Sequence, residues 1–225
     1  MRPRQRSARG SGTELRDEIL AATRELLART GNADTVSIRD VAKLVGVTAP
    51  SIYRHFEDKD DLLDAAVASV FEDLDAAMAA ATDPEDSPMT RLREQGLAYM
   101  RFALEHPAQY RFATAAGAKE PGAVDQVLGS GAFQRLSQTV QSVMDAGLMT
   151  PGDPQPVLLE LWSAVHGVVS LIIAKPFLPW GDPEKVVDRV MAAACLGHAV
   201  LDVIGGETPD PDEGARWITQ LREQR

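Results

Sequence analysis

The chain has 225 residues, of which 44% are hydrophobic, so it is long enough to form one large or two modest domains with a buried core. Its formal net charge of −10 argues at first against a nucleic-acid-binding protein. The charge is divided unevenly, however. Residues 1–59 carry 11 Lys/Arg and 8 Asp/Glu, a net of +3, whereas residues 60–225 carry 12 and 25, a net of −13. The N-terminal part is therefore the expected DNA-contacting end, and the acidic remainder is expected to be a solvated body.

Cysteine usage and hydropathy indicate a cytoplasmic protein. The single cysteine, Cys195, permits no disulfide within the chain and fits a reducing compartment. The N-terminal arginines are not followed by an apolar run, so no signal peptide is expected. Residues 157–174 are the most membrane-like segment, but Glu160 and His166 interrupt it. A buried helix is expected there, and no membrane contact.

Residues 1–12 are rich in Arg, Gly and Ser and lack an apolar pattern, so they are expected to form a flexible basic arm. Such an arm contacts the minor groove or phosphates in some DNA-binding proteins, and in others is only a solvated tail; the sequence favours neither. A first helix is expected from Thr13 to about Arg29. A helix-turn-helix DNA-binding domain is expected over residues 13–60 and a separate body over residues 61–225.

Residues 37–63 carry the strongest pattern in the chain. Ser37 is placed to cap a helix, with Asp40 as its capping-box partner, and Gly46 supplies the conformation that ends that helix. Thr48 is then placed to cap a second helix. Ile52 and Phe56 are four residues apart, so they are expected to face inward together.

The opposite face of the second helix is polar and free of acidic residues, as suits a helix that enters the major groove. Arg54 and Ser51 are the candidates for base edges, and Ala49 and Pro50 for close apolar contacts. Phosphate contacts are expected from Thr48, Tyr53, His55 and Lys59, and Ser37 is included in the predicted DNA-binding set. A three-helix unit that merely packs on itself would not need these exposed side chains.

Over residues 15–65 the chain resembles the TetR family of bacterial transcriptional regulators. The resemblance lies in Ile19, Leu26–Leu27 and Gly31, in the Gly46-Val47-Thr48, Ile52-Tyr53 and His55-Phe56 elements, and in Lys59 with Leu62–Leu63. It implies a ligand-responsive transcriptional regulator, expected to be a repressor, that binds a palindromic operator in double-stranded DNA as a homodimer. No cofactor or metal is expected.

The body is expected to be all-α. Helices are predicted at residues 58–81, 89–105, 108–116, 124–146, 157–174 and 183–205, separated by Pro- and Gly-rich breaks. The last two helices are apolar over more than one stripe, so they are expected to pair with their mates as a four-helix bundle. The expected contributors are Val165, Val169, Ile172, Val187, Met191 and Ala194.

The body also resembles one C-terminal class of these regulators, marked by a Trp…His-Gly element. The matching segments are residues 161–169, with Trp162, His166 and Gly167, and residues 106–112. This resemblance implies a ligand-sensing and dimer-forming domain. The expected effector is a small hydrophobic or amphipathic molecule in an apolar cavity between residues 89–146 and the 157–174 helix.

The candidate ligand-binding residues are the aromatic residues of this region together with one histidine: Tyr99, Phe102, Tyr110, Phe112, Trp162 and His166. Each has a structural alternative. Aromatic residues at helical spacing are usually core, and the pattern of Trp162 with His166 favours a packed tryptophan beside a hydrogen-bonded histidine over a pocket floor.

Other functions are less well supported. Cys195, His198 and Asp202 are spaced so that they could converge on a metal, but without a second Cys or His cluster Cys195 is interpreted as a small core residue. The chain has no glycine-rich phosphate loop, no nucleophile elbow and no His-Glu-x-x-His pair. The alternatives to a regulator are a helical enzyme with an unrecognised site and an architectural DNA-binding protein without a ligand.

Overall fold

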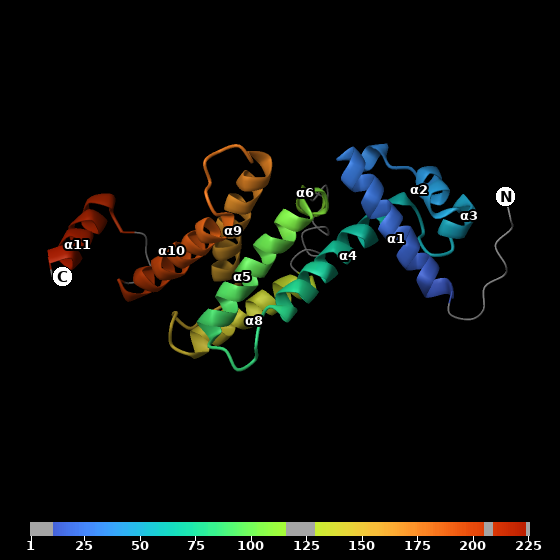
Figure 1. Cartoon of the computed structure of the whole chain (residues 1–225). Coiled ribbons are helices and arrows are strands. Elements are labelled where there is room, and N and C mark those ends of the chain that lie inside the picture. The colour runs from blue at the N-terminus through green and yellow to red at the C-terminus, as the bar shows by residue number, and fades with distance from the viewer. Residues whose placement is uncertain (1–10, 116–128, 205–208, 224–225) are drawn as a thin grey trace.

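The structure is a computed structural model that describes residues 11–115, 129–204 and 209–223. Every regular element in these ranges is a helix, which confirms the predicted all-α class. Figure 1 shows α1–α3 gathered at one end of an elongated molecule and α11 at the other. The helices are α1 (Ser11–Thr30), η1 (Ala33–Thr35), α2 (Ile38–Val45), α3 (Ala49–Ile52), α4 (Lys59–Ala80), α5 (Pro88–Glu105), α6 (Pro107–Ala115), α8 (Gly131–Asp145), α9 (Pro154–Ala174), α10 (Pro183–Val203) and α11 (Pro211–Glu223).

The N-terminal head, formed by α1, η1, α2, α3 and the start of α4, has its own hydrophobic core. Ile19, Val41 and Ile52 are completely buried at its centre, with Leu27 and Phe56 beside them. The residues predicted to face inward on the second helix, Ile52 and Phe56, therefore do so. Ser11 and Gly12 belong to α1, so the arm predicted for residues 1–12 is too long by these two residues, and residues 1–10 lie outside the described residues.

Helix α4 joins the head to the body. Leu62 and Ala66, on its first turns, are buried in the head core, whereas Val70 and the buried residues after it belong to the core of the body. The helix begins as predicted: Asp58 accepts a hydrogen bond from the Asp61 amide (2.8 Å), and the Asp61 carboxylate accepts one from the Glu57 amide (2.8 Å). One continuous helix thus runs through two cores.

The body packs α4, α5, α8, α9 and α10 around a single core, while α6 lies against α1, α4 and α5. Its predicted helices are present, with shifted ends. Helix α9 begins at Pro154, inside the predicted loop, because Asp153 caps it and proline is tolerated in a first helical turn. The predicted 124–146 helix is wrong at Gly129 and Ser130, which form a turn and the N-cap of α8, so the helix begins at Gly131; residues 124–128 lie outside the described residues.

Helix α9 is long and apolar enough to cross a membrane by length and composition alone, with a mean hydropathy of 1.9. Core helices of other proteins pass the same test, and this one packs against α5, α8 and α10. However, only 28% of the most apolar 18-residue stretch of this helix is buried within the chain. The prediction of a buried helix is therefore confirmed only for the side that faces the body. Much apolar surface therefore remains on the outside of the protomer.

Five of the six residues predicted to form the dimer contact are buried inside the protomer, and the sixth, Ala194, is half-buried, so the prediction is wrong for those five. Val169 and Val187 have no exposed surface, and Val165, Ile172 and Met191 are also buried. They form the seam where α9 and α10 pack against the rest of the body. The apolar residues left exposed on these two helices are others: Leu159, Leu171, Leu196 and Val203.

Helix α11 was not predicted from the sequence. Asp210 accepts a hydrogen bond from the Asp212 amide (2.9 Å) and Pro211 occupies the first turn, so the start signal is present in the sequence. None of its residues is buried.

Gly46 gives a test of how the two helices of the head are joined. Its φ of +77° lies in the left-handed region, and the following Val47 amide donates to the Ala42 carbonyl (2.9 Å), closing α2. We expect Gly46→Ala to lower the free energy of unfolding by about 1 kcal/mol, because an L side chain is strained in this conformation.

Thermal or urea unfolding measures this change, and Gly12→Ala is the matched control. Both glycines have open space around an added Cβ, but Gly12 lies in a right-handed helix. We expect Gly12→Ala to leave stability unchanged or to raise it slightly. Equal destabilisation by both substitutions would contradict the role assigned to the backbone of Gly46.

Candidate nucleic-acid interface and effector cavity

The helix-turn-helix is set by local hydrogen bonds. Ser37 caps α2, accepting from the Asp40 amide (3.2 Å) and donating to the Asp40 carboxylate (2.5 Å). Thr48 occupies the cap position of α3, but the prediction that its side chain caps the helix is wrong. Its hydroxyl is bonded instead to the Ser51 hydroxyl (3.0 Å), which places two polar side chains together on the outside of α3.

The surface predicted to read DNA is exposed. Pro50 and Arg54 are exposed, and Tyr53 shows 53% of its surface, while Ile52 between them is completely buried. Helix α3 is shorter than predicted and ends at Ile52, because the His55 and Phe56 amides both close onto the Ile52 carbonyl. Arg54 therefore projects from the turn after the helix and not from the helix itself.

The remaining predicted DNA contacts lie around this surface. Thr48 is exposed, and Ser37, Ala49, Ser51 and His55 are half-buried. The amine of Lys59 donates to the backbone carbonyl of Asp34 (3.1 Å), which ties the start of α4 to η1. Lys59 thus has a structural partner in the head besides any phosphate.

The head and the body are connected by a polar cluster at Arg24. From α1, its guanidinium contacts Asp73 of α4 (2.5 Å) and Gln109 of α6 (2.7 Å). Arg24 is only 18% exposed, but Asp73 is 52% exposed, so this ion pair is partly screened by solvent. Three helices therefore meet at one side chain.

The body contains an apolar cavity of about 380 Å³ that is partly open to solvent. Its walls come from five helices. They are Met78 of α4; Met89, Thr90, Leu92, Arg93, Gln95, Gly96 and Tyr99 of α5; Leu136 of α8; Leu161, Trp162 and Val165 of α9; and Asp188, Met191, Ala192, Cys195 and Leu196 of α10. The volume falls within the range of small-molecule sites, about 300–1,000 Å³.

Beside the cavity, two tyrosines, a tryptophan and a histidine share hydrogen bonds. Trp162 Nε1 donates to the Tyr99 hydroxyl (3.2 Å), which lies 3.0 Å from the Tyr110 hydroxyl. Nδ1 of His166 is 2.6 Å from the Tyr110 hydroxyl and 3.0 Å from that of Tyr99, and its Nε2 is 3.3 Å from Ser170 Oγ. Burial lowers the pKa of His166 below its usual 6.5 and raises the pKa of both tyrosines, so all three are neutral near pH 7.

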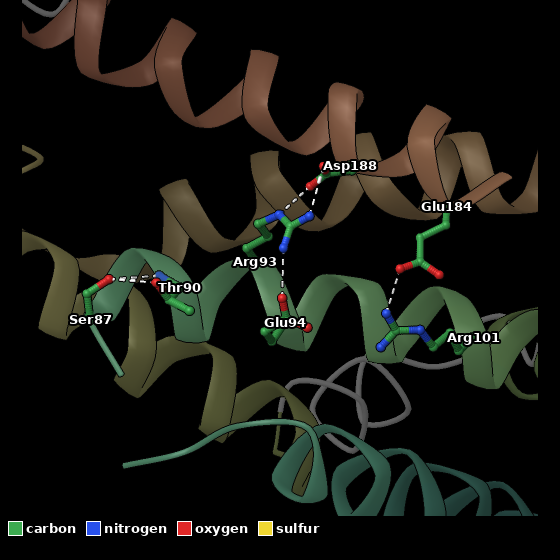
Figure 2. A network of polar contacts seen from close by, with 7 residues as sticks. All are labelled: Ser87, Thr90, Arg93, Glu94, Arg101, Glu184 and Asp188. Atoms are coloured by element: carbon green, nitrogen blue, oxygen red, sulfur yellow. Dashed lines mark hydrogen bonds and ion pairs between the residues drawn. The ribbon is translucent and has the colours of Figure 1, made fainter. Parts of the chain in front are cut away.

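Ion pairs join α5 to α10 at the edge of the cavity, as Figure 2 shows. Arg93 pairs with Asp188 through two nitrogens (2.6 and 3.0 Å) and with Glu94 through a third (2.8 Å). Further along, Arg101 bonds Glu184 (2.7 Å). The hydrogen bond from Arg93 lowers the pKa of Asp188, which stays ionised and paired.

Of the predicted ligand-binding residues, only Tyr99 and Trp162 line the cavity. Tyr110 and His166 belong to the hydrogen-bonded group behind them, as the structural alternative for His166 proposed. Phe102 is buried in the core with its ring 5.0 Å from that of His106, and Phe112 packs against both cores. The contributions of α4 and α10 to the wall were not predicted: Met191 was assigned to the dimer contact, Cys195 was interpreted as a core residue, and Met78 was not singled out.

The spacing of Cys195, His198 and Asp202 does not bring them together. Cys195 is buried at the cavity, where burial raises its pKa, whereas His198 Nε2 lies 2.9 Å from Glu160 and Asp202 accepts from the Thr150 amide (2.7 Å). Among the described residues there is no group of three side chains able to hold a metal ion.

Two family models match this chain. Residues 19–66 match the model described as bacterial regulatory proteins, tetR family, and residues 92–194 match a tetracyclin repressor-like C-terminal domain. Among solved structures, a protein of unknown function from Rhodococcus sp. RHA1 superposes with a TM-score of 0.70 at 29% identity, covering 88% of this chain and 100% of that one. A TetR family regulator from Marinobacter aquaeolei superposes with a TM-score of 0.66 at 20% identity, covering 83% and 98%.

Curated relatives match mainly over shorter stretches. The regulator BetI of Ectopseudomonas mendocina is 40% identical over 81 residues, 35% of this chain and 40% of its own. The nucleoid occlusion factor SlmA of Vibrio cholerae is 29% identical over 96 residues, 43% and 49% respectively. The chain thus spans about half the length of the curated relatives that it matches most strongly.

The exposed helix-turn-helix face and the separate helical body define a DNA-binding transcriptional regulator. The two matched models together cover most of the fold. The chain belongs to the TetR family of bacterial transcriptional regulators. Membership of the Trp-His-Gly subclass stays a prediction.

Gly96 gives a test of the cavity. A Cβ at this position would lie 2.0 Å from Met191 Sδ, so the Met191 side chain of α10 occupies the space that a side chain at residue 96 would need. Gly96→Ala should push the flexible Met191 side chain into the cavity and weaken binding of a neutral lipophilic dye, N-phenyl-1-naphthylamine, by about tenfold.

Dye fluorescence in a titration measures this affinity. Gly167→Ala on α9 is the matched control, because an added Cβ there meets nothing within 4 Å. We expect the control to bind the dye as the unmodified chain does. If Gly96→Ala also bound it unchanged, the dye would not occupy this cavity.

Proposed function

We propose that the protein is a ligand-responsive repressor that binds a palindromic operator as a homodimer in the cytoplasm and is released by a small hydrophobic or amphipathic molecule. One observation carries the proposal. An exposed helix-turn-helix face and an apolar cavity occur in one chain, and helix α4 contributes to both the head core and the cavity wall. A ligand that fills the cavity can therefore act on the helix that holds the head.

For the DNA contacts, we propose that Arg54 and Ser51 face base edges in the major groove, with Ala49 and Pro50 in close apolar contact. Arg54 is exposed and projects from the turn, so its guanidinium is free to extend toward a guanine. Thr48, Tyr53, His55 and Lys59 lie around it as candidates for phosphate. Ser37 acts through its cap, which orients α2.

A dimer is needed because one such head reads few base pairs. Two-fold pairing of two heads on successive major grooves requires half-sites about 34 Å apart. The exposed apolar residues of α9 and α10 are the proposed contact, since Leu171 and Leu196 expose 52% and 64% of their surface. Covering these residues would also account for the apolar character of α9.

The proposed switch depends on the difference in ligand affinity between two arrangements of the head. The cavity touches α4 through Met78, near the C-terminal end of that helix, and Tyr99 links the cavity wall to Tyr110 of α6. Helix α6 in turn contacts α1, because Gln109 of α6 accepts a hydrogen bond from Arg24 of α1. Ligand binding therefore has two physical routes to the head.

A second candidate is DNA binding without an effector, which the matches to proteins named nucleoid occlusion factor favour. The cavity argues for the first candidate, because a protein that only occupies DNA needs no apolar chamber in its body. An enzymatic role has no support from the family or the fold.

The test is to select bound fragments from genomic DNA and to footprint them. We expect a near-palindromic site, and Arg54→Ala should weaken binding by about 1–3 kcal/mol while relaxing the preference at one position of each half-site. Arg222→Ala, which removes the same charge on α11, is the control and should bind normally.

The same operator tests the release. Molecules that raise the melting temperature of the protein should also dissociate the complex with DNA. Equal weakening by Arg54→Ala on all sequences would restrict Arg54 to phosphate contact. Stabilising molecules that leave DNA affinity unchanged would favour the second candidate.

The dimer contact is tested by placing a charge on the exposed face. Leu171→Glu should raise the dissociation constant of the dimer at least 100-fold, because the carboxylate would be buried without a partner. Sedimentation equilibrium measures this constant.

Leu44→Glu is the matched control, since that leucine is 43% exposed but lies in the head. It should remain dimeric. A tight dimer of Leu171→Glu would locate the contact elsewhere.

A further inference from the structure

We propose that Arg16 of α1 binds a backbone phosphate of DNA at the edge of the reading surface, where the ring of Phe56 holds its guanidinium. Arg16 would thus join the DNA contacts proposed above, on which this inference rests, and none of them includes it. The contacts of the guanidinium, its lack of a carboxylate partner and the place of Phe56 in the chain all point to this role.

Arg16 lies at the edge of the surface proposed to read DNA. Its guanidinium carbon is 5.3 Å from the centre of the Phe56 ring. Phe56 follows Arg54 and His55 in the turn after α3, and the rings of His55 and Phe56 are 6.5 Å apart. Figure 1 shows α1 at the same end of the molecule as α2 and α3. A charge from another helix is therefore held beside residues proposed to contact DNA.

Arg16 differs in its partners from the other two arginines of α1. Arg24 is paired with Asp73, and Arg29 lies 3.7 Å from Glu25. Arg16 is exposed and has no hydrogen bond or ion pair with another residue of the described ranges. Its charge is therefore available to an anion from outside the chain.

The acidic residues close to Arg16 in the sequence project from other sides of α1. Glu14 and Glu18 are each two residues away, and side chains at that spacing do not face each other on a helix. Asp17, the next residue, points about 100° away. Leu20, four residues on, shares the side of Arg16 and is buried in the head core. Arg16 therefore leaves the helix along the core and away from both glutamates.

An arginine that lies over an aromatic ring can bind a phosphate at the same time. The guanidinium is planar and carries five N–H donors, so contact with a ring on one side leaves donors directed elsewhere. Attraction to the ring also restrains a long side chain, which then loses less rotamer freedom on binding. Phe56 is only 2% exposed, so the head core fixes the position of this ring.

A DNA phosphate is the anion that fits this position. The major groove is about 12 Å wide, so a recognition element inside it has a phosphate backbone along each side. Arg54 is proposed to reach base edges within the groove, whereas Arg16 lies to the side of it, beyond Phe56. Arg16 should therefore add affinity without sequence preference.

The experiment measures how the affinity for DNA depends on salt. Fluorescence anisotropy gives the affinity of the full chain for the operator selected from genomic DNA and for an unrelated duplex of the same length. Arg16→Met keeps the apolar stem over Phe56 and removes the charge. Between about 50 and 200 mM KCl, we expect the slope of log affinity against log salt to become shallower by about 0.9 for each head. Both duplexes should lose affinity by the same factor, within about twofold.

Further variants separate the charge from the packing. Arg16→Lys keeps the charge and should keep the slope. Arg29→Met is the matched control, because it removes an exposed arginine at the other end of α1 and should leave slope and affinity unchanged. Arg16→Gln repeats the test if the methionine variant does not fold. A role confined to stabilising the head would lower the melting temperature without changing the slope.

The proposal is overturned if loss of the Arg16 charge leaves the slope unchanged, if Arg16→Lys or Arg29→Met reduces the slope as much as Arg16→Met does, or if only the operator loses affinity. In each of these cases the unmodified chain still binds its operator, so the proposed function stands. Failure of the unmodified chain to bind either duplex would overturn both.

Discussion

The structure depends on the burial of one helix in two hydrophobic cores. Helix α4 contributes Leu62 and Ala66 to the core of the head, and Val70, Leu74 and Met78 to the core of the body. Neither core is complete without it, so the two parts of the chain cannot be treated as modules on a flexible linker. The Arg24 cluster reinforces this connection, because it joins α1 to α4 and α6 at the level where one core gives way to the other.

The cavity wall is shaped by polar side chains that bond to one another. Its charged residues neutralise each other at the edge and its tyrosine, tryptophan and histidine side chains bond among themselves, so the wall presents an almost entirely apolar surface. The methionines make that surface adaptable, and Gly96 leaves room for the Met191 side chain against α5. Of the residues that line the cavity, Gln95 has a buried oxygen, Oε1, without a hydrogen-bond partner among the described residues.

The head could be predicted from the sequence because its signals are local. A serine cap, a glycine in the left-handed region and an inward pair at i and i+4 each act over a few residues, and Ser37, Gly46, Ile52 and Phe56 all take the expected places. The length of α3 could not be predicted, since its end depends on how the chain turns onto α4.

The body was less predictable for a different reason. An apolar helix with two stripes does not reveal which stripe faces its own core, and Val169 and Val187 were assigned to the wrong one. The cavity wall likewise draws Met78 and Met191 from helices more than a hundred residues apart, and no spacing within one helix indicates that they meet. The burial of Gln95 could not be predicted either, because its hydrogen-bond partner Thr139 lies on another helix.

Ser69 lies at the boundary between the two cores, and its hydroxyl donates to the Ala66 carbonyl three residues earlier (2.8 Å). Back-bonding of this kind often bends a helix. About ten residues separate Ser69 from the start of α4, a lever arm of about 15 Å, so a tilt of about 10° at this point displaces Lys59 by about 2.6 Å. Lys59 carries η1 with it through the Asp34 carbonyl. In the proposed two-fold pair the two displacements would add, so the distance between the reading heads would change by up to about 5 Å, a substantial fraction of the 34 Å repeat of DNA.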